Sequence, residues 1–307
     1  MTNLKQLVDD TYAEGFRSIY GEVLITARDE RWLMHCVQAV TGHASSTILC
    51  DCEAGVAQWI GAEAAAEGAT PDGRMGAVVQ FHVPRFLKNR RQQLEQVMLA
   101  RISQNVLTCP TARCFNLIDS DDYFKLGRKI ALFGDRHQFR DQRYGTRGWV
   151  IPILGGEFYL SRKFGYRDGV MGGNLWFFGP DEDTALDAAE RAAFAAEAAA
   201  DVITTFPGGV AASGSKAGSS YPFLIAATYA EYCPTLRDKL GDQSKVPDGV
   251  GSIMEIIING RDLDSLKHAT RQAIHAAAET PDLVKISAGN YGGRLGKTFV
   301  HLHELIS

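Results

Sequence analysis

The fold is decided by the stretch Ser252-Ile253-Met254-Glu255-Ile256-Ile257-Ile258-Asn259-Gly260-Arg261-Asp262. Five of the six residues at 253–258 are apolar and four of them are β-branched isoleucines, which predicts a strand buried on both faces. Asn259-Gly260 ends this strand, and Asp262 stands where it can cap a following helix. The stretch therefore predicts a buried strand that turns tightly into a helix.

One carboxylate, Glu255, lies inside this apolar run. A buried carboxylate without a partner costs several kcal/mol, or becomes neutral because burial raises its pKa. Such a group can serve in acid–base catalysis. It can equally lie at a sheet edge or pair with a nearby Lys or Arg, and the pattern alone leaves these alternatives open.

A second copy of the pattern begins at Gly21. An offset of 233 residues aligns Glu22 with Glu255 and Asp29 with Asp262. Each copy reads as a strand, a tight turn, a helix and a second strand. We therefore predict a repeated supersecondary unit and two lobes of like architecture.

The first lobe is predicted to contain strands at 21–27, 45–52 and 76–83 and helices at 29–40 and 86–107. These two helices and three strands fit the split βαβ, ferredoxin-like arrangement, which places two helices on four short strands. The polar segment 110–148 holds the predicted boundary, which divides the chain into an N-terminal lobe, 1–147, and a C-terminal lobe, 148–307.

The second lobe is predicted to contain helices at 181–204 and 262–279 and strands at 157–161, 170–178, 283–287 and 297–303, besides the strand of Glu255. We expect an α+β fold of two ferredoxin-like lobes related by internal duplication. Each would have an antiparallel sheet with helices packed on one face.

Composition excludes several classes of protein. The formal charge of −4 and the pI near 6.1 give no general attraction to nucleic acid or to an anionic membrane. No apolar run approaches the roughly 20 residues of a membrane span, and residues 1–5 show no secretory signal. The six cysteines form no Cys-x-x-Cys pair, so neither a disulfide framework nor a zinc site is indicated. We expect a soluble, cytoplasmic protein with reduced thiols.

The glycine-rich loop 206–219 resembles a phosphate loop, but Ser215 stands where that motif requires lysine and Lys216 comes one residue late. What remains is a small-residue loop with free N–H groups, the hydroxyls of Ser213 and Ser215, and Lys216. It could hold an anionic substrate group or an oxyanion. A plain surface turn fits the same composition.

Two further glycine clusters carry the amides of Asn174 and Asn290, and these too are candidate substrate contacts or simple strand bulges. His301 and His303 would share one side of a strand, as in some metal sites, but no third ligand has a telling spacing. We predict no metal site and interpret both histidines as structural.

Two basic stretches are candidate anion sites, although exposed charge runs are usually solvated faces. Their members are Arg85, Lys88, Arg90 and Arg91 in the first stretch, and Arg136, Arg140, Arg143 and Arg147 in the second. No Gly-x-Ser-x-Gly elbow or catalytic cysteine signature occurs, so nucleophilic catalysis has no support.

An ordered set of motifs resembles the formylmethanofuran–tetrahydromethanopterin formyltransferase family over nearly the whole chain. The motifs are Asp10-Thr11-Tyr12-Ala13-Glu14, Val23-Leu24-Ile25-Thr26-Ala27, Pro71-Asp72-Gly73-Arg74, Leu132-Phe133-Gly134-Asp135, Gly156-Glu157-Phe158, Gly172-Gly173-Asn174, Phe206-Pro207-Gly208-Gly209, Tyr232-Cys233-Pro234-Thr235, Glu255 to Gly260, Lys285-Ile286-Ser287-Ala288-Gly289-Asn290 and His301-Leu302-His303. The 84–120 segment matches poorly.

The resemblance implies a cytoplasmic acyltransferase of one-carbon metabolism that moves a formyl group between the amine of a furan coenzyme and a ring nitrogen of tetrahydromethanopterin. Both coenzymes would be substrates, with no metal and no tightly bound cofactor. The family's proposed catalytic carboxylate maps onto Glu255. The expected substrate contacts are Asn174, Ser213, Ser215, Lys216 and Asn290.

The balanced charge is unlike that of the acidic archaeal members, which favours a methylotrophic bacterial form working in formaldehyde oxidation. Its expected partners are further copies of itself, the other subunits of a formyltransferase/hydrolase complex, or both. One basic stretch would then contact the polyglutamate tail of the furan coenzyme. The alternatives are a non-catalytic scaffold subunit of that complex and a transferase with a folate-type acceptor.

Overall fold

The computed structural model describes residues 4–294 and 296–306, which form two compact units. Unit 1 comprises the described residues of Met1–Arg17 and Val170–Ser307, and unit 2 comprises Ser18–Gly169. Strands β1 (Tyr12–Thr26) and β9 (Phe164–Gly179) are long, and each contributes one end to each unit.

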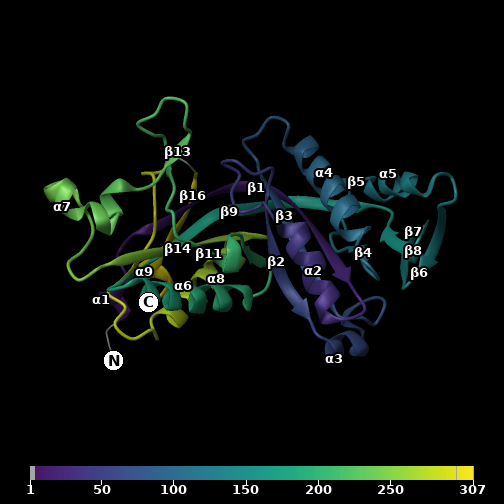
Figure 1. Cartoon of the computed structure of the whole chain (residues 1–307), viewed down its shortest axis with the longest axis horizontal. Helices are drawn as coiled ribbons and strands as arrows, with labels where there is room; N and C mark the ends of the chain where they lie inside the picture. Colours follow the sequence, from purple (N-terminus) through teal and green to yellow (C-terminus); the bar gives the residue numbers. More distant parts are fainter. Residues whose placement is uncertain (1–3, 295, 307) are drawn as a thin grey trace. The chain divides into compact units, whose positions relative to one another are not determined.

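Unit 2 is built on four antiparallel strands in the order β2-β3-β1-β4, since β3 pairs with both β1 and β2 and β1 also pairs with β4. Helix α2 follows β1 and helix α4 follows β3 (Figure 1). The bounds are β2 (Glu53–Ile60), β3 (Gly76–Pro84), β4 (Arg113–Asn116), α2 (Glu30–Thr41) and α4 (Arg90–Arg101).

The helices of unit 2 pack on one apolar face of these strands. Asp29 caps α2 by accepting a bond from the Trp32 N–H at 3.0 Å, and the buried side of α2 includes Leu33. A Cβ at Gly21 would lie 2.4 Å from the sulfur of Met98, so glycine on β1 lets α4 approach the sheet closely.

The opposite face of the same strands is polar. The Gln80 amide donates to Glu22 at 2.7 Å, and His82 contacts Gln80 at 3.0 Å and Ser18 at 3.1 Å. The Tyr20 ring stacks on His82, and burial lowers the pKa of His82 to about 3.

A second set of strands extends unit 2 through β8, which pairs with β4 in parallel and with β7, while β7 pairs with β6. The remaining elements are α3 (Ala62–Ala64), a π-helical turn (Ala65–Ala69), a second π-helical turn (Ile102–Val106), β5 (Tyr123–Phe124), α5 (Leu126–Ala131), a 3₁₀ turn (Leu132–Gly134), β6 (Phe139–Arg143), β7 (Thr146–Ile153) and β8 (Gly156–Ser161).

Two predictions for this unit need correction. Residues 45–52 are not a strand: Thr47 bonds to Glu53 Oε1 through its N–H at 3.1 Å and its hydroxyl at 3.2 Å, which holds a turn ahead of β2. The helix expected at 86–107 starts at Arg90 and passes into a π-helical turn at Ile102. The polar segment 110–148, where the boundary is predicted, contains β4, β5, α5 and β6.

Unit 1 is built on four antiparallel strands in the order β10-β14-β9-β15. Helix α6 follows β9 and helix α8 follows β14, and both pack along β14 (Figure 1). The bounds are β10 (Val202–Thr204), β14 (Ser252–Gly260), β15 (Lys285–Ser287), α6 (Glu182–Glu197) and α8 (Leu263–Ala277).

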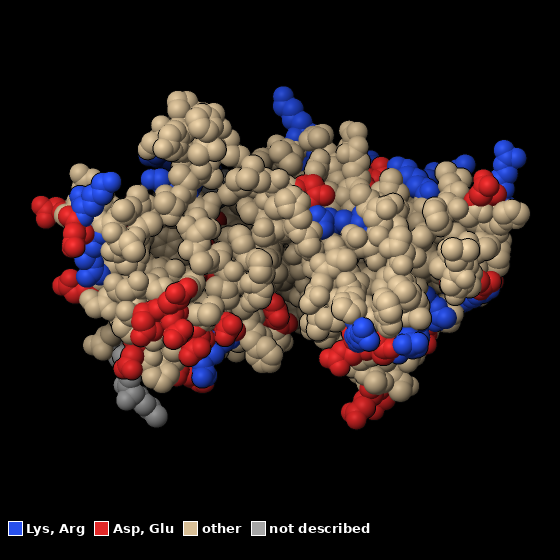
Figure 2. Space-filling view, in the orientation of Figure 1, with Lys and Arg blue, Asp and Glu red and all other residues tan. Residues whose placement is uncertain are grey.

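Alanines bring α6 and α8 close together. Asp181 and Asp262 cap the two helices by accepting from the Thr184 and Ser265 N–H groups, both at 2.8 Å. The fully buried alanines are Ala185, Ala188, Ala189, Ala192 and Ala196 on α6 and Ala269, Ala273 and Ala277 on α8. The exposed side of α6 is acidic, with Glu182, Asp183, Asp187 and Glu190, and Figure 2 shows red side chains gathered there.

Helix α6 is shorter than predicted. It ends at Glu197 rather than near residue 204, since Ala200 and Asp201 adopt positive φ angles of 59° and 60° and start β10. The last predicted strand is also shorter: β16 (Thr298–His301) gives way to α9 (Leu302–Leu305).

The other elements of unit 1 are short. They are α1 (Leu4–Leu7), a 3₁₀ turn (Pro207–Gly209), β11 (Val210–Ala211), β12 (Lys216–Ala217), β13 (Ala226–Ala227), 3₁₀ turns (Ala230–Tyr232, Pro234–Leu236 and Gly241–Gln243) and α7 (Arg237–Leu240). β11 pairs with β14, β12 with β13, and β16 with the start of β1. No helix among residues 4–294 and 296–306 is long and apolar enough to cross a bilayer.

Both units follow the same chain order of strand, helix, strand, strand, helix, strand. The two copies found by the offset of 233 residues are β1-α2-β2 in unit 2 and β14-α8-β15 in unit 1. The first copy therefore supplies the first three elements of its unit, whereas the second copy supplies the last three elements of its unit.

Candidate functional site

The candidate site lies on the face of unit 1 that is turned away from α6 and α8. In β14, Met254, Ile256 and Ile258 face the helices, so alternation directs Glu255 to the other side. Trp176 of β9 stands directly across from Glu255, and Ala211 of β11 flanks it on the opposite edge. Glu255 therefore lies within the sheet and not at its edge.

Two side chains of β9 hold the carboxylate. Asn174 Nδ2 donates to Glu255 Oε1 at 2.8 Å, and Trp176 Nε1 donates to the same oxygen at 2.9 Å. Asn174 and Trp176 share one face because residues two apart on a strand point the same way. Glu255 shares that face because it pairs directly with Trp176 on the neighbouring strand. Both bonds end on Oε1, so Oε2 is the oxygen left for another partner.

Glu255 is 5% exposed, and no Lys or Arg of the described chain lies within ion-pair distance of it. Burial raises the pKa of Glu255 above its ordinary value, and the bonds from Asn174 and Trp176 offset only part of that effect. A carboxyl group of this kind can hold or release a proton nearer to neutral pH.

Aromatic rings cover the carboxylate. Tyr229 and Tyr232 each lie edge-on to Trp176 with ring centroids 4.9 Å apart, and Phe178 packs beside them. Tyr229 and Tyr232 belong to the segment 229–250, whose Val246 and Val250 are buried against Trp176 and Phe178 of β9. The cover removes water from Glu255, which explains the raised pKa.

Two buried polar atoms in this site, the Oδ1 atom of Asn174 and the hydroxyl of Tyr229, have no hydrogen-bond partner of normal geometry among the described residues. Buried polar atoms are nearly always paired in folded proteins, so these two atoms are candidates to bond a substrate. Burial, the adjacent Tyr291 hydroxyl and the charges of Glu255 and Glu231 raise the pKa of Tyr229. Its hydroxyl therefore remains a proton donor at neutral pH.

The loop after β15 fits closely over Asn174 and Trp176. A Cβ at Gly289 would lie 2.7 Å from Asn174 Nδ2 and 2.8 Å from a ring carbon of Trp176. Only glycine leaves both donors in place for Glu255.

A second buried carboxylate, Glu14 of β1, fixes this loop. Glu14 is 1% exposed and accepts from the N–H groups of Tyr291 at 2.7 Å, Gly293 at 2.9 Å and Gly296 at 2.8 Å. The Tyr291 hydroxyl in turn donates to the Ser215 carbonyl at 2.5 Å. Glu14 thus joins the loop after β15 to the loop that carries Ser215.

The structure brings only some of the predicted substrate contacts to Glu255. Asn174 contacts it directly, and Ser215 is linked to the site through Tyr291. Ser213 is exposed, and its carbonyl accepts from Thr228. Two others have partners elsewhere. Asn290 Nδ2 donates to the Thr11 hydroxyl at 3.1 Å, and Lys216 Nζ lies 3.8 Å from Glu231 Oε2.

Trp176, Tyr229, Tyr291 and Glu14 are not among the site residues predicted from the sequence. Trp176 could have been predicted from the sequence, because it follows Asn174 by two residues on a strand and must share its face. The two tyrosines and Glu14 come from distant segments, and no spacing in the sequence relates them to Glu255.

The expected pairing of His301 with His303 on one strand is wrong, because His303 lies in α9. His303 Nε2 contacts the Val8 carbonyl at 2.8 Å. No group of three or more His, Cys, Asp or Glu suited to a metal occurs in the described part of the chain.

Two arginines of the second basic stretch make contacts within unit 2. Arg143 binds Asp141 at 2.7 Å and Glu157 at 2.6 Å, and Arg140 lies over the Trp149 ring at 5.1 Å. In the first stretch, Arg85 binds Asp168 at 2.6 Å.

Two family models match the chain. Residues 1–153 match the model described as formylmethanofuran-tetrahydromethanopterin formyltransferase, and residues 156–305 match the model described as FTR, proximal lobe. A formylmethanofuran–tetrahydromethanopterin formyltransferase from Methanocaldococcus jannaschii is 41% identical over 303 residues, with 97% of each chain covered. One from Methanosarcina acetivorans is 42% identical over 300 residues, again with 97% of each covered.

Solved structures give the same result. The formyltransferase from Methanosarcina barkeri superimposes with a TM-score of 0.92 at 39% identity, covering 99% of this chain and 100% of that one. A chain in the formyltransferase/hydrolase complex from Methylorubrum extorquens, solved with methylofuran, has a TM-score of 0.90 at 34% identity, covering 100% and 99%. The mixed α+β fold is therefore that of known formyltransferases.

Replacing Glu14 with Gln tests the role of this carboxylate in fixing the loop. Gln keeps the shape but loses the charge that strengthens three N–H bonds, and bonds to charged groups contribute about 1.5–3 kcal/mol each. We expect faster amide hydrogen exchange at Tyr291, Gly293 and Gly296. Glu279→Gln, an exposed change in the same unit, is the control. Equal exchange in both variants would contradict the role.

Proposed function

The chain belongs to the formylmethanofuran–tetrahydromethanopterin formyltransferase family, and on that premise we propose that Glu255 is its catalytic acid–base group. The proposed reaction transfers a formyl group between a furan-type amine coenzyme, methanofuran or methylofuran, and a ring nitrogen of tetrahydromethanopterin. The observation that carries the role of Glu255 is its enclosure: a carboxylate with a raised pKa, held on one oxygen only, beside two unpaired polar atoms.

Formyl transfer needs one proton to leave and another to arrive. The pterin nitrogen attacks the formamide carbonyl and forms a C–N bond, giving a tetrahedral oxyanion. Glu255 accepts the proton of the attacking nitrogen, then returns a proton to the furan amine as its C–N bond breaks. A single group can serve both steps when its pKa lies near the working pH, which burial of Glu255 favours.

The two unpaired polar atoms suit the other demands of the reaction. The Tyr229 hydroxyl is a protonated donor and would stabilise the oxyanion. Asn174 turns Nδ2 to Glu255, which leaves Oδ1 to accept from an N–H group of a coenzyme. Alignment of the two bound coenzymes supplies much of the remaining rate gain, up to about 7–11 kcal/mol in intramolecular models.

The other predicted contacts remain part of the proposal in a supporting role. Ser213, Ser215 and Lys216 belong to the loop that Tyr291 ties to the site, and Asn290 lies beside Gly289 in the loop over Asn174. The proposed mechanism uses no metal and no tightly bound cofactor, since both coenzymes are substrates.

We also propose that each unit is a ferredoxin-like module and that the two arose by duplication. The shared chain order and the strand orders β2-β3-β1-β4 and β10-β14-β9-β15 support this. Along the chain, the proposed lobes are 1–147 and 148–307, and the ends of the two family matches at 153 and 156 lie near that division. The compact units differ from these lobes at 4–17, which belongs to unit 1, and at 148–169, which belongs to unit 2.

The proposed partners are the other subunits of a formyltransferase/hydrolase complex, further copies of this chain, or both. The similarity to a chain of the Methylorubrum extorquens complex supports the first. Within such a complex, one basic stretch would contact the polyglutamate tail of the furan coenzyme. A cytoplasmic location remains a proposal from the sequence.

Replacing Glu255 with Gln removes the proton acceptor while keeping the shape of the side chain. We expect kcat to fall by about 10²–10⁴-fold with little change in KM, because acid–base catalysis contributes about that much. In the wild type, kcat should rise with pH as Glu255 ionises, and this limb should be absent from the variant. The measurement is a formyl-transfer assay with both coenzymes across pH.

The control for this change is Asp264→Asn, an exposed carboxylate on α8. Near-normal turnover in Glu255→Gln would remove Glu255 from the acid–base role. No turnover by the wild type, alone or with partner subunits, would favour the alternative function of a non-catalytic scaffold subunit.

Replacing Tyr229 with Phe tests the proposed oxyanion donor. The ring and its packing on Trp176 are kept, and only the hydroxyl is lost. We expect kcat to fall by about 10²–10³-fold, as for other oxyanion donors, with the pH limb of Glu255 retained. Tyr232→Phe, which alters the neighbouring ring, is the matched control. A Tyr229→Phe enzyme as active as this control would exclude the donor role.

The proposed contact with the coenzyme tail is tested by reversing the charges of each basic stretch in turn. Loss of attraction to an acidic tail should weaken binding of the furan coenzyme and flatten its dependence on salt. Binding and salt dependence that stay unchanged in both variants would disprove the contact.

A further inference from the structure

Unit 2 contains two cysteines that lie together, Cys36 of α2 and Cys109 in the turn after the π-helical turn Ile102–Val106. The Cys36 thiol donates to the Asn105 carbonyl at 3.5 Å, and the Cys109 thiol donates to the Trp32 carbonyl at 3.7 Å. Each thiol therefore contacts the backbone four residues before the other cysteine. In a helix the carbonyl of residue i−4 lies beside the N–H of residue i, so the Cys109 sulfur lies close to Cys36 itself.

The two thiols differ in their access to solvent. Cys36 is 1% exposed and is held within α2. Cys109 is half-buried, and its neighbours along the chain, Thr108 and Pro110, are exposed. A small solute can therefore reach the sulfur of Cys109 directly, whereas it reaches Cys36 only through Cys109.

The two thiols also differ in how readily they ionise. The Cys36 thiol donates to Cys109 and so lowers the pKa of Cys109, although burial opposes this effect. The interaction with Cys109 and then burial raise the pKa of Cys36. Cys109 is therefore the member of the pair that forms the reactive thiolate. An accessible thiol of lowered pKa beside a second thiol is typical of redox-responsive cysteines.

The other four cysteines lack this combination. Cys50 and Cys233 are also half-buried, but the partners that the structure gives them are hydroxyl and carbonyl groups. Cys52 and Cys114 are buried, and burial raises the pKa of both. Among the described residues, Cys109 is thus the half-buried cysteine that interacts with a second thiol.

We propose that Cys36 and Cys109 form a redox-active pair that reduces a small hydroperoxide and closes into a disulfide. In the first step the Cys109 thiolate attacks one oxygen of the peroxide. The S–O bond forms as the O–O bond breaks, the sulfur loses two electrons, and the departing oxygen takes up a proton. The products are a sulfenic acid on Cys109 and, from hydrogen peroxide, water.

In the second step the Cys36 sulfur attacks the sulfur of the sulfenic acid. The S–S bond forms as the S–O bond breaks, and the hydroxide leaves with the proton of the Cys36 thiol as a second water. A disulfide needs Cα atoms about 4.4–6.8 Å apart. Because Cys109 lies in a turn and not in a helix, its backbone can adjust to this distance without disturbing α2.

The test treats the whole reduced protein with a small molar excess of hydrogen peroxide at neutral pH and then blocks free thiols with N-ethylmaleimide. We expect the oxidised protein to take up two fewer N-ethylmaleimide groups than the reduced protein, and a peptide map to link Cys36 with Cys109. Dithiothreitol should restore both thiols. Without peroxide, Cys109 should react with N-ethylmaleimide about fivefold faster than Cys50 or Cys233, because the thiolate is the nucleophile.

Three variants separate the two steps. Cys36→Ser should stop at the sulfenic acid, which dimedone captures on Cys109, and Cys109→Ser should give neither the adduct nor the disulfide. Cys50→Ser removes a half-buried thiol outside the pair and is the matched control, in which the disulfide should form as in the wild type. The peptide map of the wild type decides the matter even if burial of Cys36 prevents its variant from folding.

The reaction should depend on the fold, so the wild type in concentrated urea should lose the preference for this pair. Three results would overturn the proposal. They are a wild type that keeps all its thiols under peroxide, a disulfide that links Cys36 to Cys114 instead, and equal rates of alkylation at Cys109, Cys50 and Cys233.

Discussion

Burying a carboxylate in the middle of a β-strand costs several kcal/mol unless hydrogen bonds replace the lost water. At Glu255, unit 1 offsets this cost with two N–H donors from one neighbouring strand and with no cation from the described residues. A salt bridge would have held the group ionised and lowered its pKa, whereas neutral donors leave the pKa raised. This choice of partner keeps Glu255 able to exchange a proton.

The glutamate of the other copy shows what the enclosure adds. Glu22 occupies the matching place on β1, also faces away from its helices, and accepts from the Gln80 amide at 2.7 Å. It is partly exposed, whereas Glu255 is covered by the aromatic rings of the segment 229–250. Two strands of similar sequence thus place a carboxylate alike, and only the added segment turns one of them into a buried acid.

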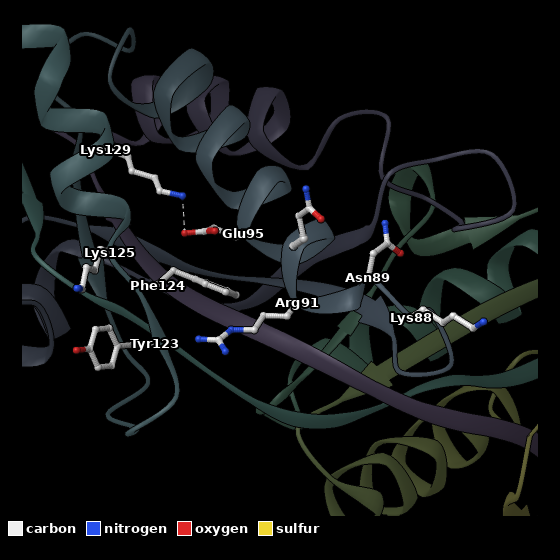
Figure 3. A pocket seen from close by; sticks show the side chains of 9 residues that line it. Lys88, Asn89, Arg91, Glu95, Tyr123, Phe124, Lys125 and Lys129 are labelled. Carbon is white, nitrogen blue, oxygen red and sulfur yellow. Dashed lines mark hydrogen bonds and ion pairs between the residues drawn. The ribbon is translucent and has the colours of Figure 1, made fainter.

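The candidate site and a basic pocket of unit 2 differ in how rigidly the fold holds the residues that form them. Around Glu255, Gly289 must lack a side chain and Glu14 fixes the loop by three N–H bonds, so small displacements are resisted. A pocket in unit 2 between the start of α4, β5 and α5 is lined instead by exposed cationic side chains, among them Lys88, Arg91 and Lys125 (Figure 3). The first arrangement suits chemistry that depends on position, and the second suits binding by charge.

The sequence by itself determined the elements with strong local signals. Strand β14, the capping of α2 and α8 by Asp29 and Asp262, and the isolated Glu255 all follow from periodicity and side-chain chemistry, which act over a few residues. The same local logic failed at 45–52, where bonds from Thr47 to Glu53 replaced the expected strand. Only the tertiary structure decided which groups surround Glu255, because Tyr229 and Tyr291 come from segments far apart in the sequence and Glu14 fixes the Tyr291 loop from a third. Their convergence depends on strand pairing and on loop packing, and neither leaves a fixed spacing in the chain.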